Sequence, residues 1–288
     1  MPPQPERKER RTSPLRTRRR RARVIAVFAA LVLCAAIAYG VHALSYLSQF
    51  NVDRVIVEGT ERVPPSLIVA YVDSVLHDGS YHFLSRTNIA LYPRTAIEKG
   101  IVASFPRIQE ARVSRSSFAA KTVSVVVAER SPFAQWCASL QDGDTEDAKC
   151  YAMDDTGFIF ADATSSEASS FATPYVFFGG VTDAPIGKRF IPGHLSGVLA
   201  LLNIFRERGE YIPTGVHVDG EQDFSVPFTA GFVLKASFGQ SADILARDLE
   251  LVLSSDALRG KVSELEYVDL RFGNRVYYKL IGEEQATE

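Results

Sequence analysis

The side chains best suited to chemistry in this sequence are its histidines and one pair of adjacent aspartates. No two histidines have the spacing of metal ligands on one helix, and the nearest cluster, within residues 77–82, falls in a predicted loop. Asp154 and Asp155 resemble a carboxylate pair, but adjacent side chains on a strand diverge, and the Thr-Gly that follows favours a turn. The five histidines are His42, His77, His82, His194 and His217.

Sequence motifs of the common enzyme classes are missing as well. The chain contains no G-x-S-x-G, no phosphate-binding loop and no dinucleotide fingerprint. Asp269 and Arg271 are two residues apart in a predicted strand, so they share a face and are expected to form a structural ion pair. We therefore predict no catalytic residue, no cofactor, no metal and no small-molecule substrate, and we expect that the protein is not an enzyme.

The three cysteines divide between two environments. Cys34 lies in an apolar segment and reads as an ordinary apolar residue, whereas Cys137 and Cys150 flank an acidic loop. If that loop lies in an oxidising compartment, a disulfide there would contribute about 3 kcal/mol by closing the loop. Two separate buried thiols are the alternative. Since no C-x-x-C is present, thiol redox catalysis has little support.

Charge divides the chain into unequal parts. Residues 1–23 hold ten of the 32 Lys and Arg and two of the 34 Asp and Glu, so 22 basic and 32 acidic residues remain. Residues 24–44 carry no formally charged side chain. As a helix rising about 1.5 Å per residue, they span roughly 31 Å, which matches a bilayer core. The positive-inside rule then predicts a single-pass plasma (inner) membrane protein with residue 45 onward outside the cytoplasm.

Two other interpretations of this N-terminal region remain open. A secretory signal peptide would have the same basic head and apolar stretch, and Ala36-Ile37-Ala38 has the small residues of a cleavage site. The arginines of residues 18–21 would also attract anionic lipid or nucleic acid. The length of the apolar span and of the basic head favours an uncleaved anchor, and topology control alone explains the arginines, so we expect no nucleic-acid partner.

Hydrophobic periodicity predicts a first extracytoplasmic domain over residues 50–130. A strand is expected at residues 52–58, a helix at 65–76 and a second helix at about 93–103. Two strands follow at about 108–115 and 121–129. A β-α-α-β-β unit of this kind covers one face of a small sheet with two helices.

A second, β-rich domain with two helices is predicted over residues 131–281. Its helices are marked by apolar spacing at residues 195–205, ended by Gly209, and at 244–252, where Ser241 is placed to cap. The fold class is therefore α+β, with a basic tail at residues 1–23, the transmembrane helix at 24–44 and a polar tail at 282–288. Short strands are expected at 133–137, 150–153, 158–161, 175–178, near 216, and at 224–228, 232–236, 263–269 and 275–280.

Five stretches in this order resemble the FtsQ/DivIB family of bacterial cell-division proteins, and the match covers nearly the whole chain. Residues 117–120 depart from the family, which often carries a proline in that tight turn, and the loop at 138–149 is longer and more acidic than usual. The matching stretches are FNVDRVIVEG (50–59), FPRIQEARVSR (105–115), VVVAERSPFAQW (125–136), MDDTGFIF (153–160) and LEYVDLRFGNRVYY (265–278).

The resemblance implies a non-enzymatic divisome scaffold whose first domain is of the POTRA type. Such a protein links early and late division proteins at the septum and helps to control septal peptidoglycan synthesis. Its implied partners are an FtsB–FtsL type coiled coil, with FtsK-like and septal synthase components as further candidates. An outer-membrane assembly factor with a POTRA domain and a single-pass cell-wall enzyme are the alternatives.

The last predicted strand is the expected binding surface. Arg275, Tyr277 and Lys279 alternate with apolar residues, so one face should pack on the sheet while the other meets water. An edge strand of this kind offers unpaired backbone groups to which a partner segment can add a strand. By resemblance, the partner-binding residues are Phe272, Val276, Tyr277 and Tyr278, and the alternative is that these aromatic residues only pack the last hairpin. A weaker candidate surface on the first domain involves Val55 and residues 97–102, although core packing explains these apolar residues better.

Overall fold

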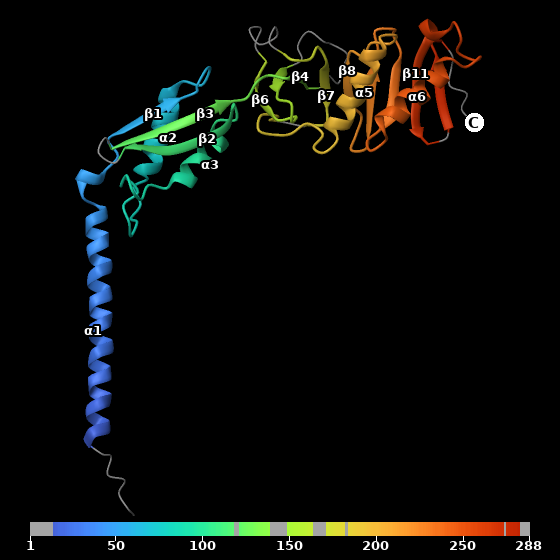
Figure 1. Ribbon diagram of the computed structural model, residues 1–288. Helices are drawn as coiled ribbons and strands as arrows, with labels where there is room; N and C mark the ends of the chain where they lie inside the picture. The colour runs from blue at the N-terminus through green and yellow to red at the C-terminus, as the bar shows by residue number, and fades with distance from the viewer. Residues whose placement is uncertain are drawn as a thin grey trace, which may run out of the picture. The chain divides into compact units, whose positions relative to one another are not determined.

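The computed structural model describes residues 14–117, 121–138, 149–163, 171–181, 184–273 and 275–282. Most of the predicted basic and polar tails, the turn at 118–120 and the acidic loop between the cysteines lie outside these ranges. The structure is mixed α+β with one long apolar helix near the N-terminus, as predicted (Figure 1). It forms two compact units, Met1–Ile101 with Ala111–Val127 and Val102–Glu110 with Ala128–Glu288.

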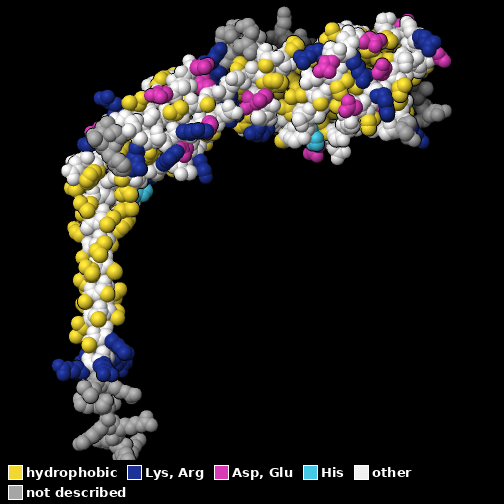
Figure 2. Space-filling view, in the orientation of Figure 1, with side chains coloured by type: hydrophobic (Ala, Val, Ile, Leu, Met, Phe, Trp, Pro, Cys, Tyr) yellow, Lys and Arg dark blue, Asp and Glu magenta, His cyan; other side chains and the backbone are white. Residues whose placement is uncertain are grey.

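Helix α1 (Pro14–Ser45) contains the predicted span and extends beyond it toward the N-terminus. The extension runs through the arginines, which are good helix formers. Along the span, large apolar side chains such as Val24, Phe28 and Leu33 are exposed to more than half of their surface. Figure 2 shows hydrophobic side chains along the whole helix and Lys and Arg at its N-terminal end. A helix that is apolar on every side needs an apolar surrounding, so its length and composition suit a membrane span.

In the first unit, a short helix η1 (Ser48–Phe50) leads into a three-stranded sheet of order β1-β3-β2. Its strands are β1 (Arg54–Glu58), β2 (Ile108–Ser117) and β3 (Thr122–Glu129), and β1 runs parallel to β3. Helices α2 (Pro65–Leu76) and α3 (Arg94–Ser104) connect β1 to β2. The elements thus follow the predicted order, and α2 has the predicted bounds because Pro65 is suited to a first helical position.

The core of this unit comes from one stripe of each helix and alternate positions of the strands. Ile68 and Val72 of α2 and Ile97 and Ile101 of α3 are fully buried. The weaker binding surface predicted around residues 97–102 is therefore wrong for these two isoleucines, which are core residues.

The second unit contains a nine-stranded sheet of order β12-β11-β10-β9-β8-β7-β4-β5-β6. Its strands fall within a few residues of the predicted positions. They are β4 (Ala134–Cys137), β5 (Cys150–Met153), β6 (Ile159–Asp162), β7 (Val176–Gly179), β8 (Gly215–Val218), β9 (Asp223–Pro227), β10 (Val233–Ser237), β11 (Leu265–Phe272) and β12 (Arg275–Leu280).

Helices α5 (Leu195–Arg208) and α6 (Ala242–Leu253) bury their apolar stripes in the core that they share with this sheet. Gly209 ends α5 in the left-handed conformation, at φ 72°, as predicted. Ser241 occupies the N-cap position before Ala242, but the prediction that its side chain caps α6 is wrong, because that side chain makes no capping hydrogen bond. Its backbone carbonyl accepts from Leu245 at 3.0 Å instead. A further short helix, η2 (Val262–Glu264), precedes β11.

Candidate partner-binding edge

Strand pairing arranges the second unit's side chains in rows that cross the sheet. In one row Trp136 stands beside Phe177, and Leu234 stands beside Val268, which is opposite Tyr278 of β12. The first four of these side chains are buried in the core under the helices. Because residues opposite one another on adjacent strands share a face, Tyr278 continues this apolar row to the end of the sheet.

The neighbouring row lies on the face opposite the helices and is polar and aromatic. It passes from Phe178 to His217, Ser225 and Lys235, and then to Asp269 and Tyr277. The rings of Phe178 and His217 stack with centroids 4.4 Å apart. Burial lowers the pKa of His217 below its ordinary value, so the ring is neutral at neutral pH. The two rows thus end on β12 in two adjacent tyrosines that face opposite sides of the sheet.

Strand β12 is the outer strand of the sheet, with β11 on one side and no strand of the described chain on the other. Its six residues, at about 3.3 Å each, present an edge of roughly 20 Å. The pairing with β11 is irregular between Leu265 and Tyr267 and between Asp269 and Phe272. Irregularities of this kind twist an edge strand and re-aim its side chains.

The expectation that one face of β12 packs on the sheet holds only in part, because Leu280 packs against the core while Val276, Tyr277 and Tyr278 are exposed. Val276 and Tyr278 lie on the helix side, yet they are 39% and 43% exposed. The reason is the reach of the helical layer, since α6 packs against β11 but has no comparable contact with β12. Val276 and Tyr278, which a longer helical layer would bury, are therefore left exposed on the last strand.

The structure brings all four predicted partner-binding residues to the β11–β12 hairpin. The rings of Phe272 and Tyr277 meet edge to face, with centroids 5.2 Å apart. Ile281, just beyond the strand, is a further exposed apolar residue, with 66% of its surface exposed.

A charged network holds β11 in place behind this edge. The guanidinium of Arg271 donates two hydrogen bonds to Asp269, at 2.9 and 2.7 Å, and a third to Asp223 at 2.9 Å. Burial acts to raise the pKa of Asp269, but the hydrogen bonds from Arg271 outweigh it and hold that pKa below its usual range. The ion pair between Asp269 and Arg271 is therefore confirmed, and its role is structural.

At the opposite end of the sheet, the outer side of β6 is covered at its first residue, Ile159. The N–H of Ile159 donates to the carbonyl of Lys188 at 2.9 Å, and the carbonyl of Ile159 accepts from Gly187 at 2.8 Å. Phe190 anchors this covering segment because its side chain is fully buried and meets Phe177 edge to face. Gly157 permits the close approach, since a Cβ there would lie 2.9 Å from the carbonyl oxygen of Phe190.

Asp154 organises the turn beside this covered edge, which confirms the turn interpretation. Its carboxylate accepts from the N–H and hydroxyl of Thr156 and from the N–H of Phe158, at 2.7 to 2.9 Å. Arg130 donates to its other oxygen at 2.6 Å, and both side chains of this ion pair are buried. Burial acts to raise the pKa of Asp154, but these donors outweigh it, so the pKa lies below its ordinary value.

Cys137 and Cys150 stand directly opposite each other on β4 and β5, with Cα atoms 4.0 Å apart, and are disulfide-bonded. Cys34 is a free, exposed thiol on α1. Of the two arrangements left open by the sequence, the structure therefore has the bridge.

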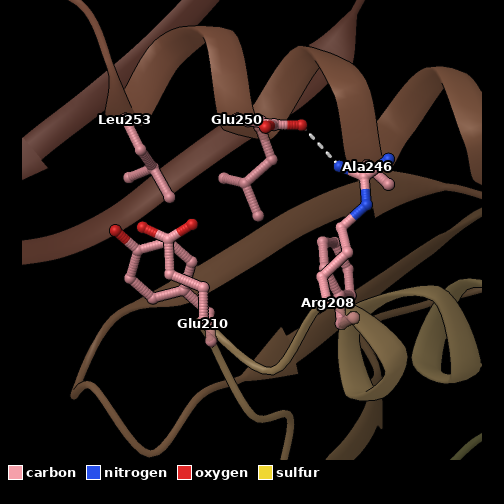
Figure 3. A pocket seen from close by; sticks show the side chains of 8 residues that line it. Arg208, Glu210, Ala246, Glu250 and Leu253 are labelled. Carbon is pink, nitrogen blue, oxygen red and sulfur yellow. Dashed lines mark hydrogen bonds and ion pairs between the residues drawn. The ribbon is translucent and has the colours of Figure 1, made fainter.

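A pocket of about 250 Å³ lies beside α5 and α6. Figure 3 shows Arg208 directed at Glu250, to which it donates at 2.6 Å. Burial raises the pKa of Tyr211, so its phenol is protonated at neutral pH. No nucleophile with an adjacent base lines this pocket. Its lining is Phe205, Arg208, Glu210, Tyr211, Ala246, Leu249, Glu250 and Leu253.

Among the described residues no group of three or more His, Cys, Asp or Glu is placed to hold a metal ion. Asp78, His82 and Arg86 do form a small ionic cluster in the loop between α2 and α3. Hydrogen bonding to His82 lowers the pKa of Asp78 to about 2, so the carboxylate is charged at neutral pH.

No protein-family model matches the chain, and no curated protein matches it.

Proposed function

We propose that this protein is a membrane-anchored scaffold of the FtsQ/DivIB type, which acts in cell division by binding partners and not by catalysis. In this proposal α1 crosses the plasma membrane with its arginine-rich end in the cytoplasm. Residues 50–130 form a POTRA domain and residues 131–281 the β domain, both outside the cytoplasm. The likeness of five sequence stretches to that family motivates the choice.

The uncovered edge of β12 is the observation that carries the proposal. Within the described residues no strand pairs with its outer side, and exposed aromatic and aliphatic side chains lie on both of its faces. Edges of this kind invite strand addition, and soluble proteins usually protect them with charge, proline or a covering segment. An uncovered edge on a sheet whose opposite edge is covered therefore supports a binding role.

The expected ligand of this edge is an extended segment of about six residues from an FtsB–FtsL type coiled coil. Backbone hydrogen bonds to β12 would supply much of its affinity. Apolar side chains on alternate positions would pack on Val276 and Tyr278 on one face and on Tyr277 on the other. FtsK-like and septal synthase components are proposed as further partners, with no surface assigned to them.

The test is capture of the FtsB–FtsL coiled coil by the full chain and by two variants. Val276→Pro removes a backbone donor from the edge, and Tyr278→Ala removes an exposed ring. Each should weaken capture at least about tenfold, the effect of losing about 1.4 kcal/mol of binding free energy. Leu251→Ala, which truncates an exposed apolar residue on α6, is the matched control and should leave capture unchanged.

Unchanged capture by both edge variants would refute the proposed binding site. Depletion of the protein in cells tests the wider role, because filamentous undivided cells support division. Failed insertion of outer-membrane proteins would point to an assembly factor, and cleavage of peptidoglycan by the purified protein would point to an enzyme.

A further inference from the structure

The C-terminal end of α1 is tied by hydrogen bonds to the loop at residues 78–88. His42 Nδ1 lies 2.6 Å from the carbonyl oxygen of Phe83, and the Tyr46 hydroxyl donates to the carbonyl of His82 at 2.6 Å. Ser45, which is buried, accepts from the N–H of Ser85 through its hydroxyl. The carbonyl of Ser45 accepts from the side chain of Asn88 at 3.0 Å. This loop is therefore attached directly to the last turn of the proposed span.

The position of these contacts along α1 sets the depth of the loop relative to the membrane. His42 stands within the apolar segment 24–44, two residues before its end. If the span ended before Tyr39, it would be 15 residues long, or roughly 22 Å, which is shorter than a bilayer core of about 30 Å. The core must then extend to about His42, and Phe83 lies at the same depth as that residue. The loop therefore meets the boundary between hydrocarbon and headgroups.

Aromatic side chains surround His42 at this level and face outward. The ring centroids of Tyr39, Tyr46, Tyr81 and Phe83 all lie within 6.4 Å of the His42 ring. Tyr81 is 77% exposed and Phe83 is 56% exposed despite these contacts. Tyrosine and tryptophan favour the membrane interface because one end of the ring is apolar and the other is polar. We call these four aromatic residues the collar.

The rest of the loop carries charged side chains that require contact with water or lipid headgroups. Asp78 binds the side chains of His82 and Arg86, and it also accepts from the N–H of Ser80 at 3.1 Å. Irregular backbone does not occur in lipid-exposed hydrocarbon, so these charged groups must lie among headgroups and water. Exposed apolar rings beside the span, with charged groups in the same loop, are the arrangement expected of a segment at the bilayer surface.

We infer that residues 78–88 form a second membrane contact, in which Tyr81 and Phe83 enter the phospholipid interface beside α1. The inference rests on the proposed membrane anchor and adds to it. The collar is continuous with the apolar surface of α1, which makes a phospholipid bilayer the occupant of this surface. The protein would then meet the membrane through a helix and a loop, and the loop would restrict how the first unit rotates on its anchor.

The test places the photoreactive residue p-benzoylphenylalanine in the full chain in membranes that contain labelled phospholipid. Phe83 and Tyr81 are the test positions, and Leu31 in the middle of the span is the positive control. Leu67 is the matched negative control because it is similarly exposed. It lies near the start of α2, about 14 Å along the helix from Leu76, the last helical residue before the loop. Lipid adducts at Phe83 and Tyr81 should exceed those at Leu67 about tenfold, as contact with the interface requires.

The outcomes separate this inference from the anchor. Lipid adducts at Leu31 without adducts at Phe83 or Tyr81 would overturn the loop contact and leave the anchor intact. No adduct at Leu31 would remove the anchor itself. Adducts of Phe83 and Tyr81 with a protein instead of lipid would show that another membrane protein covers the collar, and would also overturn the inference.

A second measurement covers the case in which the bulky probe disturbs the loop. Tyr81→Trp in vesicles that contain brominated phospholipid should lose at least about twice as much of its added fluorescence as Leu67→Trp, because bromine quenches on contact at the interface. Trp136 is a constant background in both variants, since it is buried in the second unit. Equal quenching of the two variants would again count against the loop contact.

Discussion

The two outer strands of the nine-stranded sheet, β6 and β12, differ in whether another segment covers their outer side. At β6 a covering segment satisfies both backbone groups of Ile159, and Phe190 anchors that segment in the core. At β12 the backbone edge and the apolar side chains of both faces are left open. Since an uncovered apolar edge promotes association, we propose that the covered edge serves stability and the open edge serves recognition. Each prediction below tests that division.

The largest effect is expected at the anchor of the covered edge. Phe190→Ala should lower the free energy of unfolding by about 3–5 kcal/mol, the usual cost of emptying a buried phenylalanine site. Unfolding in urea can be followed by the fluorescence of Trp136, the one tryptophan of the chain, which reports on the second unit. Hydrogen exchange at the Ile159 amide should also accelerate.

Tyr278→Ala is the matched control for this experiment because its ring is exposed at the other edge. It should change the free energy of unfolding by less than about 1 kcal/mol, as surface substitutions generally do. If the two substitutions lowered the free energy of unfolding equally, the covered edge would contribute no more to stability than the open edge.

The next effect concerns the bridge between β4 and β5, the strands adjacent to β6. Replacing both Cys137 and Cys150 by serine should lower the free energy of unfolding by about 3 kcal/mol, since a loop of this size is no longer closed in the unfolded chain. Capture of the coiled coil by the folded protein should not change. Cys34→Ser is the control and should leave both quantities unaltered, and a loss of capture in the double variant would connect the two edges.

A smaller effect, with a pH signature, is expected at Asp154. Because its folded-state pKa is lowered, its contribution is complete above the unfolded carboxyl pKa of about 3.9 and is lost as pH falls through the lower folded-state value. Asp154→Asn should cost about 1.5–3 kcal/mol at neutral pH. The variant and the parent should converge in stability as the pH falls below that window.

Urea unfolding between pH 2 and pH 7 measures this convergence. Asp155→Asn, at the exposed neighbouring residue, provides the control and should follow the parent at every pH. Parallel curves for Asp154→Asn and the parent would mean that the carboxylate titrates alike in the folded and unfolded states.

Much of the fold follows from local patterns. The period of apolar residues located α2 and α5, and Gly209 marked the end of α5, because helix periodicity and a left-handed terminal glycine are properties of short segments. Strand positions were predicted equally well where β-branched and aromatic residues lie between turn residues, as in β3 and β12. The ion pair of Asp269 and Arg271 was predictable because two residues on one strand face need no tertiary information.

The candidate site was only partly predictable. The sequence indicated that β12 is an edge strand and named its aromatic residues, but it also predicted that Val276 and Tyr278 pack inward. Alternation along a strand says which residues share a face, and it does not say whether a helix extends far enough to cover that face. The cap expected of Ser241 failed for a similar reason, since composition identifies a suitable residue but not the direction of its hydroxyl.

The sequence by itself determined the charged head, the apolar span, the order of the elements and the residues of the last strand, because each depends on neighbours a few positions away. Only the tertiary structure decided that β6 is covered while β12 is open, and that residues 78–88 lie against the end of α1. These features join segments about 29 to 41 residues apart, as in the contacts of Lys188 with Ile159 and of Phe83 with His42. Contacts over such separations are set by how the whole chain packs, so no local pattern records them.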